Sequence, residues 1–522
     1  STNLLSTLPR NWIHGLYFQD DWKLRPNLTA NLGVRWQVQS TMNNKYGQQS
    51  SFDPNAPDNI AAGAKGVITH PGQLHNKDWN NFQPRIGLAW TARPNLVIRT
   101  GFALSTVDDR LPNPPTNEFG SITARIDTPS GQYAPLFQLG AGPIMPLVWP
   151  VIRADGSIPF TGSNYSGRSA NWVDPKRKSP YSMNWNLSIQ RAIARNYLVE
   201  FTYSGNRGVN NYENREINQQ SYDWGWNLRQ TNPAEFSRME GNTQPYRPFP
   251  NFGGITFQTN GANSVYHAGT VKFEKRYASG LSFLTYYTYS KSISSSTGSA
   301  LIPRNLDRAR SGFDRTHQYT GSMNYEIPIG RGRKWLNRGG VWNALVGGFD
   351  MVFVYRISSG NPQTFGMSGS PYRYMPGIIA YRGGRPNSTG QSAHLRDGWA
   401  DFGGDRWTRG NQNKMIESMS YFTYPDAYTA GNVGARTMDA QRFIDNEFSA
   451  SKEFKIKERF SILLRYDFQN PFKWYNLSNP NTTVNFVNPS QFGTISTSTS
   501  DEATTAGGGG QPLQNITIAF RW

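Results

Sequence analysis

Side chains alternate between apolar and polar along segment after segment of this 522-residue chain, and this period constrains the fold more than any other feature. Successive side chains of a β-strand point to opposite faces of its sheet, so a period of two predicts strands with one apolar and one polar face. From Leu28 to Gln39 every even position is apolar, while the odd positions are polar or glycine. The same period returns over residues 183–190, 460–469 and 516–522. The sequence therefore predicts an all-β protein.

The alternating segments are long for strands. Soluble strands average about 5–6 residues, whereas strands that cross a membrane at a tilt need about 9–11. Many segments here reach ten residues or more. We predict about thirteen main strands, over residues 11–24, 28–41, 82–93, 96–107, 181–194, 197–206, 264–278, 281–293, 314–328, 348–360, 442–456, 459–472 and 514–522.

The connections between these segments alternate in length. Short turns rich in Pro, Asn and Gly, such as Arg25-Pro26-Asn27 and Ser279-Gly280, alternate with long segments over residues 42–81, 108–180, 207–263, 294–313, 361–441 and 473–513. A longer basic connection, Gly330 to Gly347, falls on the side of the short turns. Outer-membrane barrels have short periplasmic turns and long extracellular loops. The pattern therefore predicts a transmembrane antiparallel β-barrel.

Composition agrees with a barrel and excludes other classes. The mean hydropathy of −0.62 looks soluble, but it averages an apolar face and a wet face. No run approaches about 18 apolar residues, which a membrane helix would need, and the absence of Cys excludes a disulfide scaffold. The net charge of +18 comes from scattered Lys and Arg without a nucleic-acid motif, so an anionic lipid or ligand is favoured over nucleic acid.

Several motifs resemble one family in family order. They are Leu16 to Trp36, Asn81 to Trp90, Gly280 to Lys291, Phe313-Asp-Arg-Thr-His317 and Phe468 to Phe472. Over nearly the whole chain the sequence resembles the barrel of TonB-dependent outer-membrane receptors, and it is most similar to the Oar-like branch with many acidobacterial members. The closing Phe520-Arg-Trp522 resembles the insertion signal of outer-membrane proteins; an ordinary buried last strand is the alternative.

The resemblance implies a location and partners. The expected place is the outer membrane of a Gram-negative bacterium, with lipid around the barrel and barrel-assembly machinery acting on it. Import would be driven by a TonB-type complex through a plug, which these residues do not include. If Trp522 lies at the periplasmic face, the strand at 11–24 runs inward as well. Residues 1–522 are then expected to be the C-terminal portion of one barrel. Its other part is missing from these residues, has been cleaved off or is a separate chain; a smaller closed barrel is the alternative.

No catalytic constellation or cofactor motif stands out, so we expect no enzyme. The six His are dispersed, and no metal or nucleophile-elbow motif appears. The loop carboxylates Asp397, Asp401 and Asp405 form a weak candidate for Ca²⁺, and an ordinary polar loop is the competing interpretation.

Aromatic residues in the predicted outer loops are candidate ligand contacts, because rings stack on sugars or peptides. The candidates are Trp172, Trp224, Trp226, Trp399 and Trp407. Packing of long loops on each other is the competing explanation. Three functions therefore remain open: an importing receptor, a structural or adhesive outer-membrane protein, and a soluble all-β carbohydrate-binding protein or hydrolase.

Overall fold

The fold was obtained as a computed structural model. It describes residues 8–45, 47, 49–57, 65–107, 157–158, 168–295, 298–301, 307–337, 339–368, 385–391, 419–425, 431–457, 460–472, 476, 478–494 and 513–522.

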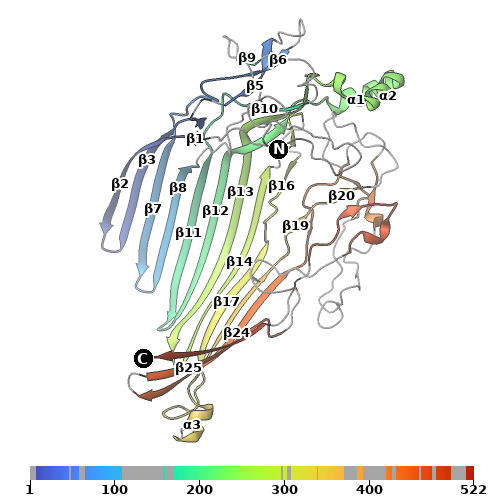
Figure 1. Cartoon of the computed structure of the whole chain (residues 1–522). Coiled ribbons are helices and arrows are strands. Elements are labelled where there is room, and N and C mark those ends of the chain that lie inside the picture. Colours follow the sequence, from blue (N-terminus) through green and yellow to red (C-terminus); the bar gives the residue numbers. More distant parts are fainter. Residues whose placement is uncertain are drawn as a thin grey trace, which may run out of the picture.

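A curved wall of thirteen consecutive antiparallel strands dominates the molecule (Figure 1). The strands are β2 (Ile13–Arg25), β3 (Leu28–Gln39), β7 (Phe82–Arg93), β8 (Leu96–Thr106), β11 (Tyr181–Ala194), β12 (Tyr197–Glu216), β13 (Phe252–Ala278), β14 (Leu281–Ser295), β17 (His317–Glu326), β18 (Phe349–Ser358), β24 (Phe443–Lys457), β25 (Phe460–Gln469) and β27 (Leu513–Arg521). Every predicted strand is present. Because each strand reverses the direction of the one before it, β2 and β27 run the same way, as predicted.

Short turns join alternate strands at one end of this wall, as the sequence predicted. The β13–β14 turn consists of Ser279 and Gly280, which have φ angles of 54° and 77°. Positive φ at both central residues is what a two-residue hairpin of type I′ requires. The longer β17–β18 connection lies at the same end and contains the short helix α3 (Val341–Val346).

The register places like residues in rows across the wall. One row is apolar and runs through Leu28, Trp90, Ile98, Ile189, Phe201, Val271 and Tyr287. The adjacent row on the other face is mainly polar and runs through Thr29, Ala89, Arg99, Ser188, Thr202, Thr270 and Thr288. The wall therefore has one apolar and one polar face, and a one-residue slip would exchange them.

Two strands are much longer than predicted. The segments 197–206 and 264–278 were too short, because β12 continues to Glu216 and β13 already begins at Phe252. The register shifts between Gly208 and Asn211, and Asn210 has a φ of 56°, which marks a bulge. Beyond it both strands pack against loops rather than presenting one apolar face, so the alternation that identified them is lost.

The long connections are ordered in several places. Three short strands, β10 (Arg168–Val173), β15 (Gly298–Ser299) and β16 (Arg308–Arg310), extend the main sheet. The helices α1 (Tyr222–Thr231) and α2 (Pro233–Gly241), which the sequence did not predict, and the turn η3 (Gln244–Tyr246) lie between β12 and β13. Further short elements are β1 (Pro9–Arg10), β4 (Asn43–Asn44), β5 (Ser51–Pro57), β6 (Lys65–Thr69), β9 (Ser157–Ile158), β19 (Pro362–Gln363), β20 (Gly366–Met367), β21 (Asn387–Ser388), η5 (Met419–Tyr421), β22 (Phe422–Thr423), β23 (Met438–Asp439), β26 (Thr483–Val484) and η6 (Pro489–Gln491).

Hydrophobic clusters form among the long connections and at the end of β13 that lies beside them. One cluster contains Phe52, Ile68, Ala170, Phe252 and Ile255. Another contains Phe365, Phe422, Val433, Met438, Val484 and Phe492, and a small one contains Leu74 and Val173. The wall strands instead expose large apolar side chains along their apolar face; Phe18, for example, is 70% exposed. Within the described residues, no helix is long and apolar enough to cross a membrane.

Candidate functional site

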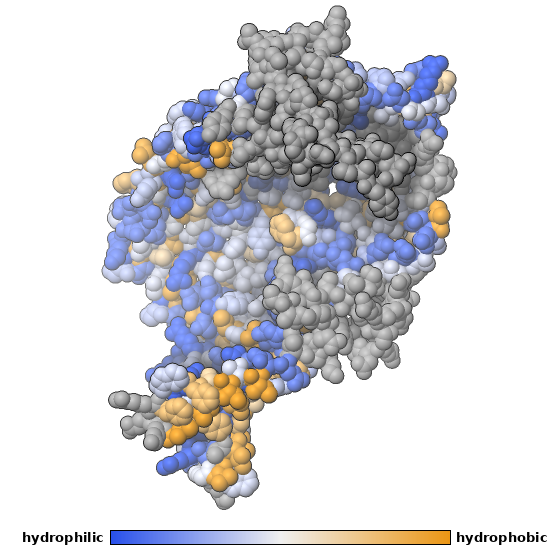
Figure 2. Space-filling view, in the orientation of Figure 1, coloured by the Kyte–Doolittle hydropathy of each residue, from blue (hydrophilic) through white to orange (hydrophobic). Residues whose placement is uncertain are grey.

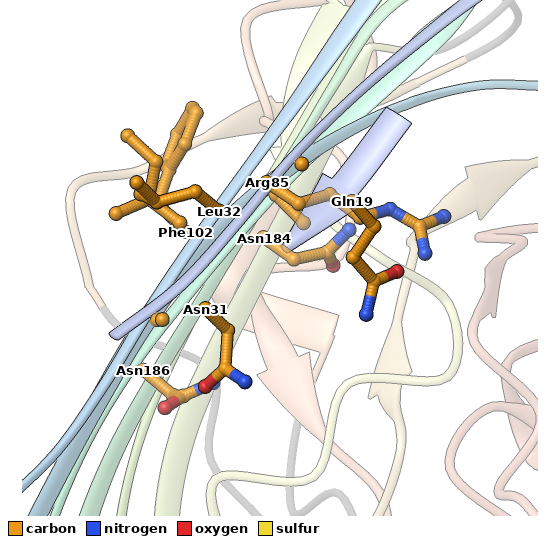
Figure 3. A pocket seen from close by; sticks show the side chains of 12 residues that line it. Gln19, Asn31, Leu32, Arg85, Phe102, Asn184 and Asn186 are labelled. Carbon is orange, nitrogen blue, oxygen red and sulfur yellow. The ribbon is translucent and has the colours of Figure 1, made fainter. Parts of the chain in front are cut away.

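A hollow lies on the wall where β2, β3, β7, β8 and β11 meet (Figure 3). Its volume is about 340 Å³. Figure 3 shows Asn31, Arg85 and Asn184 pointing to one side of the sheet, while Leu32 and Phe102 point to the other. The strand period therefore provides this region with amides and a guanidinium group on one face and an apolar surface on the opposite face.

Three glycines leave the floor of the hollow open. Gly33, Gly87 and Gly101 line it on adjacent strands. A Cβ at Gly87 would lie 3.4 Å from Asn31 Oδ1, and one at Gly101 would lie 3.6 Å from Asn186 Nδ2. These are contact distances without severe clash, so the glycines provide space rather than relieve strain. The hollow offers hydrogen-bond donors and acceptors to a polar ligand or polypeptide segment.

Polar side chains on the same face are paired along the wall. Arg99 Nη1 donates to Gln190 Oε1 at 2.9 Å, and Ser188 Oγ donates to Glu200 Oε1 at 2.7 Å. Farther along, Lys272 Nζ lies 2.8 Å from Glu274 Oε2. This face therefore carries both charge signs in satisfied pairs, and it is suited to water or a polar polypeptide rather than to hydrocarbon.

The helical pair between β12 and β13 forms a polar projection at the end of the long connections (Figure 1). The side chains of Ser221 and Asn232 cap the N-termini of α1 and α2. The Tyr246 hydroxyl donates to the Glu235 carboxylate, and Arg238 Nη1 lies 2.7 Å from Glu235 Oε2. The hydrogen bond from Tyr246 lowers the pKa of Glu235 below its ordinary 4.5, and that of Arg238 adds to the effect.

Three of the predicted loop tryptophans lie in the part of the chain that the structure describes, one on β10 and two on α1. Trp172 lies on β10, with its ring centroid 4.1 Å from that of Phe257, and it packs against one of the loop cores. Trp224 lies on α1 with its ring 6.5 Å from Tyr246. Trp226 lies on α1 too, 5.8 Å from the Arg229 guanidinium. All three are half-buried; Trp172 packs against apolar side chains, and the α1 pair lies near polar partners.

The other predicted loop sites lie outside the described residues. These are Trp399 and Trp407, and the carboxylates Asp397, Asp401 and Asp405. Elsewhere, the part of the chain that the structure describes holds no group of three or more His, Asp or Glu side chains able to bind a metal ion.

A charged clamp that sequence reasoning missed joins two long connections near β14. Arg310 Nε lies 2.8 Å from Asp314 Oδ2, and its Nη1 lies 2.5 Å from Asp439 Oδ1. The buried Asp314 carboxylate also accepts the Ser292 N–H at 2.8 Å. Asp314 belongs to the motif Phe313-Asp-Arg-Thr-His317, in which the sequence indicates only a family resemblance and no ion pair.

The last strand presents the predicted apolar row at its end. On β27, Ile516, Ile518 and Phe520 are all strongly exposed on one face, and Trp522 is 92% exposed. Phe520 pairs with Ile462 of β25. Recognition of these residues as an insertion signal and the alternative of an ordinary buried last strand both stay predictions.

Comparison with known proteins supplies a family. The model of the family described as outer membrane beta barrel domain matches residues 2–505. This match accords with the predicted fold class and with a place in the outer membrane. No curated protein sequence matches the chain.

Similar solved structures include an outer membrane transporter, an iron transporter and a siderophore receptor. The outer membrane transporter YddB from Escherichia coli is 10% identical with a TM-score of 0.43, over 98% of this chain and 54% of that one. The FrpB iron transporter from Neisseria meningitidis (F3-3 variant) is 10% identical with a TM-score of 0.40, over 90% and 42%. The siderophore receptor PiuA from Acinetobacter baumannii is 9% identical with a TM-score of 0.41, over 98% and 43%. The match thus spans about half of those chains or less.

Proposed function

Because the chain belongs to the outer membrane beta barrel domain family, we propose that it forms the wall of a receptor that binds a ligand at its outer loops and imports it. The energy would come from a TonB-type coupling complex. The observation that carries the proposal is the continuity between a polar inner face and an ordered layer of long connections. A ligand held by the loops would meet the paired side chains of that face, such as Arg99 and Gln190, on its way inward.

The orientation follows from family membership and the faces of the wall. A barrel turns its apolar face to lipid and its polar face to the lumen. The row containing Ile189, Phe201 and Val271 is then the lipid face, and the hollow beside Arg85 opens to the lumen. The short turns mark the periplasmic end and the long connections the extracellular end.

We further propose that additional strands complete the wall. Within the described residues, β2 pairs only with β3, and β27 pairs only with β25. Unpaired backbone groups in hydrocarbon cost several kcal/mol each. Direct pairing of β2 with β27 would be parallel, because the two strands run the same way, whereas all main pairs are antiparallel. An odd number of further strands would keep every pair antiparallel and close the barrel.

An uptake assay tests import. Cells that carry the complete protein would be given radioiron-loaded hydroxamate and catecholate siderophores, with peptides and oligosaccharides as further probes. We expect accumulation of one probe class that disappears when the TonB-type motor is deleted. Accumulation that is equal with and without the motor would contradict energised import.

A structural or adhesive role without transport is the second candidate, and one observation favours it. Trp172 and the loop core around Phe52 and Phe252 pack several connections against one another. If the protein binds no probe and its deletion changes cell adhesion or envelope integrity, this second function replaces the first.

A further inference from the structure

The β17–β18 hairpin, residues 327–348, lies beyond the strand ends (Figure 1), and hydrogen bonds connect its described residues, 327–337 and 339–348. Trp335 N donates to Pro328 O at 2.9 Å, and Gly330 N donates to Trp335 O at 3.0 Å. The Asn343 side chain closes the hairpin, because its Oδ1 accepts the Arg331 N–H at 2.8 Å. The backbone conformation of the hairpin is therefore held by hydrogen bonds within it and not by burial of its apolar side chains.

The hairpin exposes its large apolar residues. Val341 is 72% exposed, Trp342 61% and Leu345 62%, and Trp335 and Leu336 are exposed too. Hydrophobic residues gather at this end of the molecule (Figure 2). A contiguous apolar surface on an ordered element marks a contact with another apolar phase or partner.

One contact places the hairpin on the lipid side of the wall. Lys452 Nζ of β24 donates to the Asn343 carbonyl at 3.1 Å, and it lies 4.9 Å from the centre of the Phe349 ring. Lys452 belongs to the lipid-facing row, since it pairs with Leu464, which in turn pairs with Ile518. Asn343 of α3 is therefore adjacent to the lipid-facing surface of β24.

The charge of the hairpin is of one sign. Residues 327–348 contain Arg331, Arg333, Lys334 and Arg338 and no acidic residue. Arg333 is paired with Glu326 at 2.9 Å, just before the hairpin. Basic side chains next to exposed Trp and Leu are the composition of segments that lie in the interface of an anionic membrane.

We propose that the β17–β18 hairpin binds the phospholipid surface of the periplasmic leaflet, with Val341, Trp342 and Leu345 inserted among the lipids and its basic residues against phosphate groups. The hairpin then acts as an anchor that fixes the height of the wall in the membrane. The proposal rests on the orientation of the wall and not on ligand import, so loss of uptake activity would leave it intact.

Site-directed labelling tests the proposal, because the chain has no native cysteine. A nitroxide would be attached to Leu345→Cys in the protein reconstituted into nanodiscs that contain phosphatidylglycerol. Ser237→Cys, on the exposed face of α2, is the matched control. We expect the label at 345 to be accessible to oxygen and shielded from a water-soluble nickel complex, with the reverse at 237.

The lipid dependence separates membrane binding from other causes of shielding. Replacing Arg331 and Lys334 by Gln leaves the Arg333–Glu326 pair in place. Each neutralised side chain should lower the ratio of docked to free hairpin by about fivefold, and phosphatidylcholine discs should weaken docking in the same direction. A label at 345 as accessible to nickel as the one at 237 would overturn the proposal. So would shielding that is indifferent to lipid charge or that requires a second protein.

Discussion

Removal of the Asp314 carboxylate should open the outer connections while leaving the strand wall intact. Asp314 is 2% exposed and holds two partners, the Arg310 guanidinium and the Ser292 N–H. Arg310 in turn contacts Asp439, and its carbonyl accepts a hydrogen bond from Arg436 Nη1 at 2.7 Å. The carboxylate therefore connects the β14–β17 region to the segment that contains β23.

The magnitude follows from burial. Removing one partner of a buried ion pair costs about 3–5 kcal/mol, because the other charge is left without compensation. Asp314→Asn keeps an oxygen that can accept the Ser292 N–H, and Arg310 keeps Asp439, so the lower limit of about 3 kcal/mol applies. Asp314→Ala also leaves the Ser292 N–H without an acceptor, which adds about 1–2 kcal/mol.

Hydrogen exchange measures this effect locally. A loss of about 3 kcal/mol in local stability should raise the amide exchange rate by about two orders of magnitude, since about 1.4 kcal/mol is tenfold. The amides affected are those of Ser292 and of residues 431–441. Asp439→Asn is the matched control, because its side chain is 43% exposed and its pair with Arg310 should contribute at most about 1 kcal/mol. Equal exchange in Asp314→Asn and the unaltered protein would refute the assignment of this clamp.

Three further changes have defined outcomes. Protection of the α2 amides from hydrogen exchange should fall as the pH drops below 4.5. The folded protein lowers the pKa of Glu235, so the hydrogen bond from Tyr246 contributes its full stabilisation above the ordinary pKa of 4.5. That stabilisation is lost as the pH falls through the lowered pKa. Gly321→Ala should lower the free energy of unfolding by about 1–3 kcal/mol, because the added Cβ overlaps the Tyr355 ring, and the midpoint of thermal unfolding should fall with it. Trp172→Ala should lower the local stability of the outer connections, measured by proteolysis, by about 2–4 kcal/mol without changing the affinity for an imported ligand. A loss of affinity without a loss of stability would make Trp172 a ligand contact instead.

The alternating period located the wall strands because each of them has one apolar and one polar face. β11 was predicted with its observed bounds, and the register of its neighbours follows from the apolar rows. The prediction of strand bounds from this period fails where the two faces no longer differ. Beyond Gly208 both faces of β12 meet protein; Glu213, for example, is 1% exposed there, and no simple period remains.

Sequence reasoning was less effective for the loops and the candidate site. The clamp of Arg310, Asp314 and Asp439 joins residues far apart in the chain, so no local pattern could indicate it. The same limit applies to Trp172, because the sequence alone does not distinguish a tryptophan that packs against Phe257 from one that binds a ligand. The capping signals at Ser221 and Asn232 could have identified α1 and α2 and were overlooked.

The assignment of the two faces is the central claim, and a cysteine scan of β11 tests it most directly. Single cysteines from Asn184 to Ile189 would be labelled in the assembled protein in membranes and compared for quenching by lipid-borne and by water-soluble quenchers. We predict that positions 185, 187 and 189 respond to the lipid quencher and positions 184, 186 and 188 to the aqueous one. Equal responses at odd and even positions, or the opposite assignment, would contradict a wall whose apolar face lies in lipid.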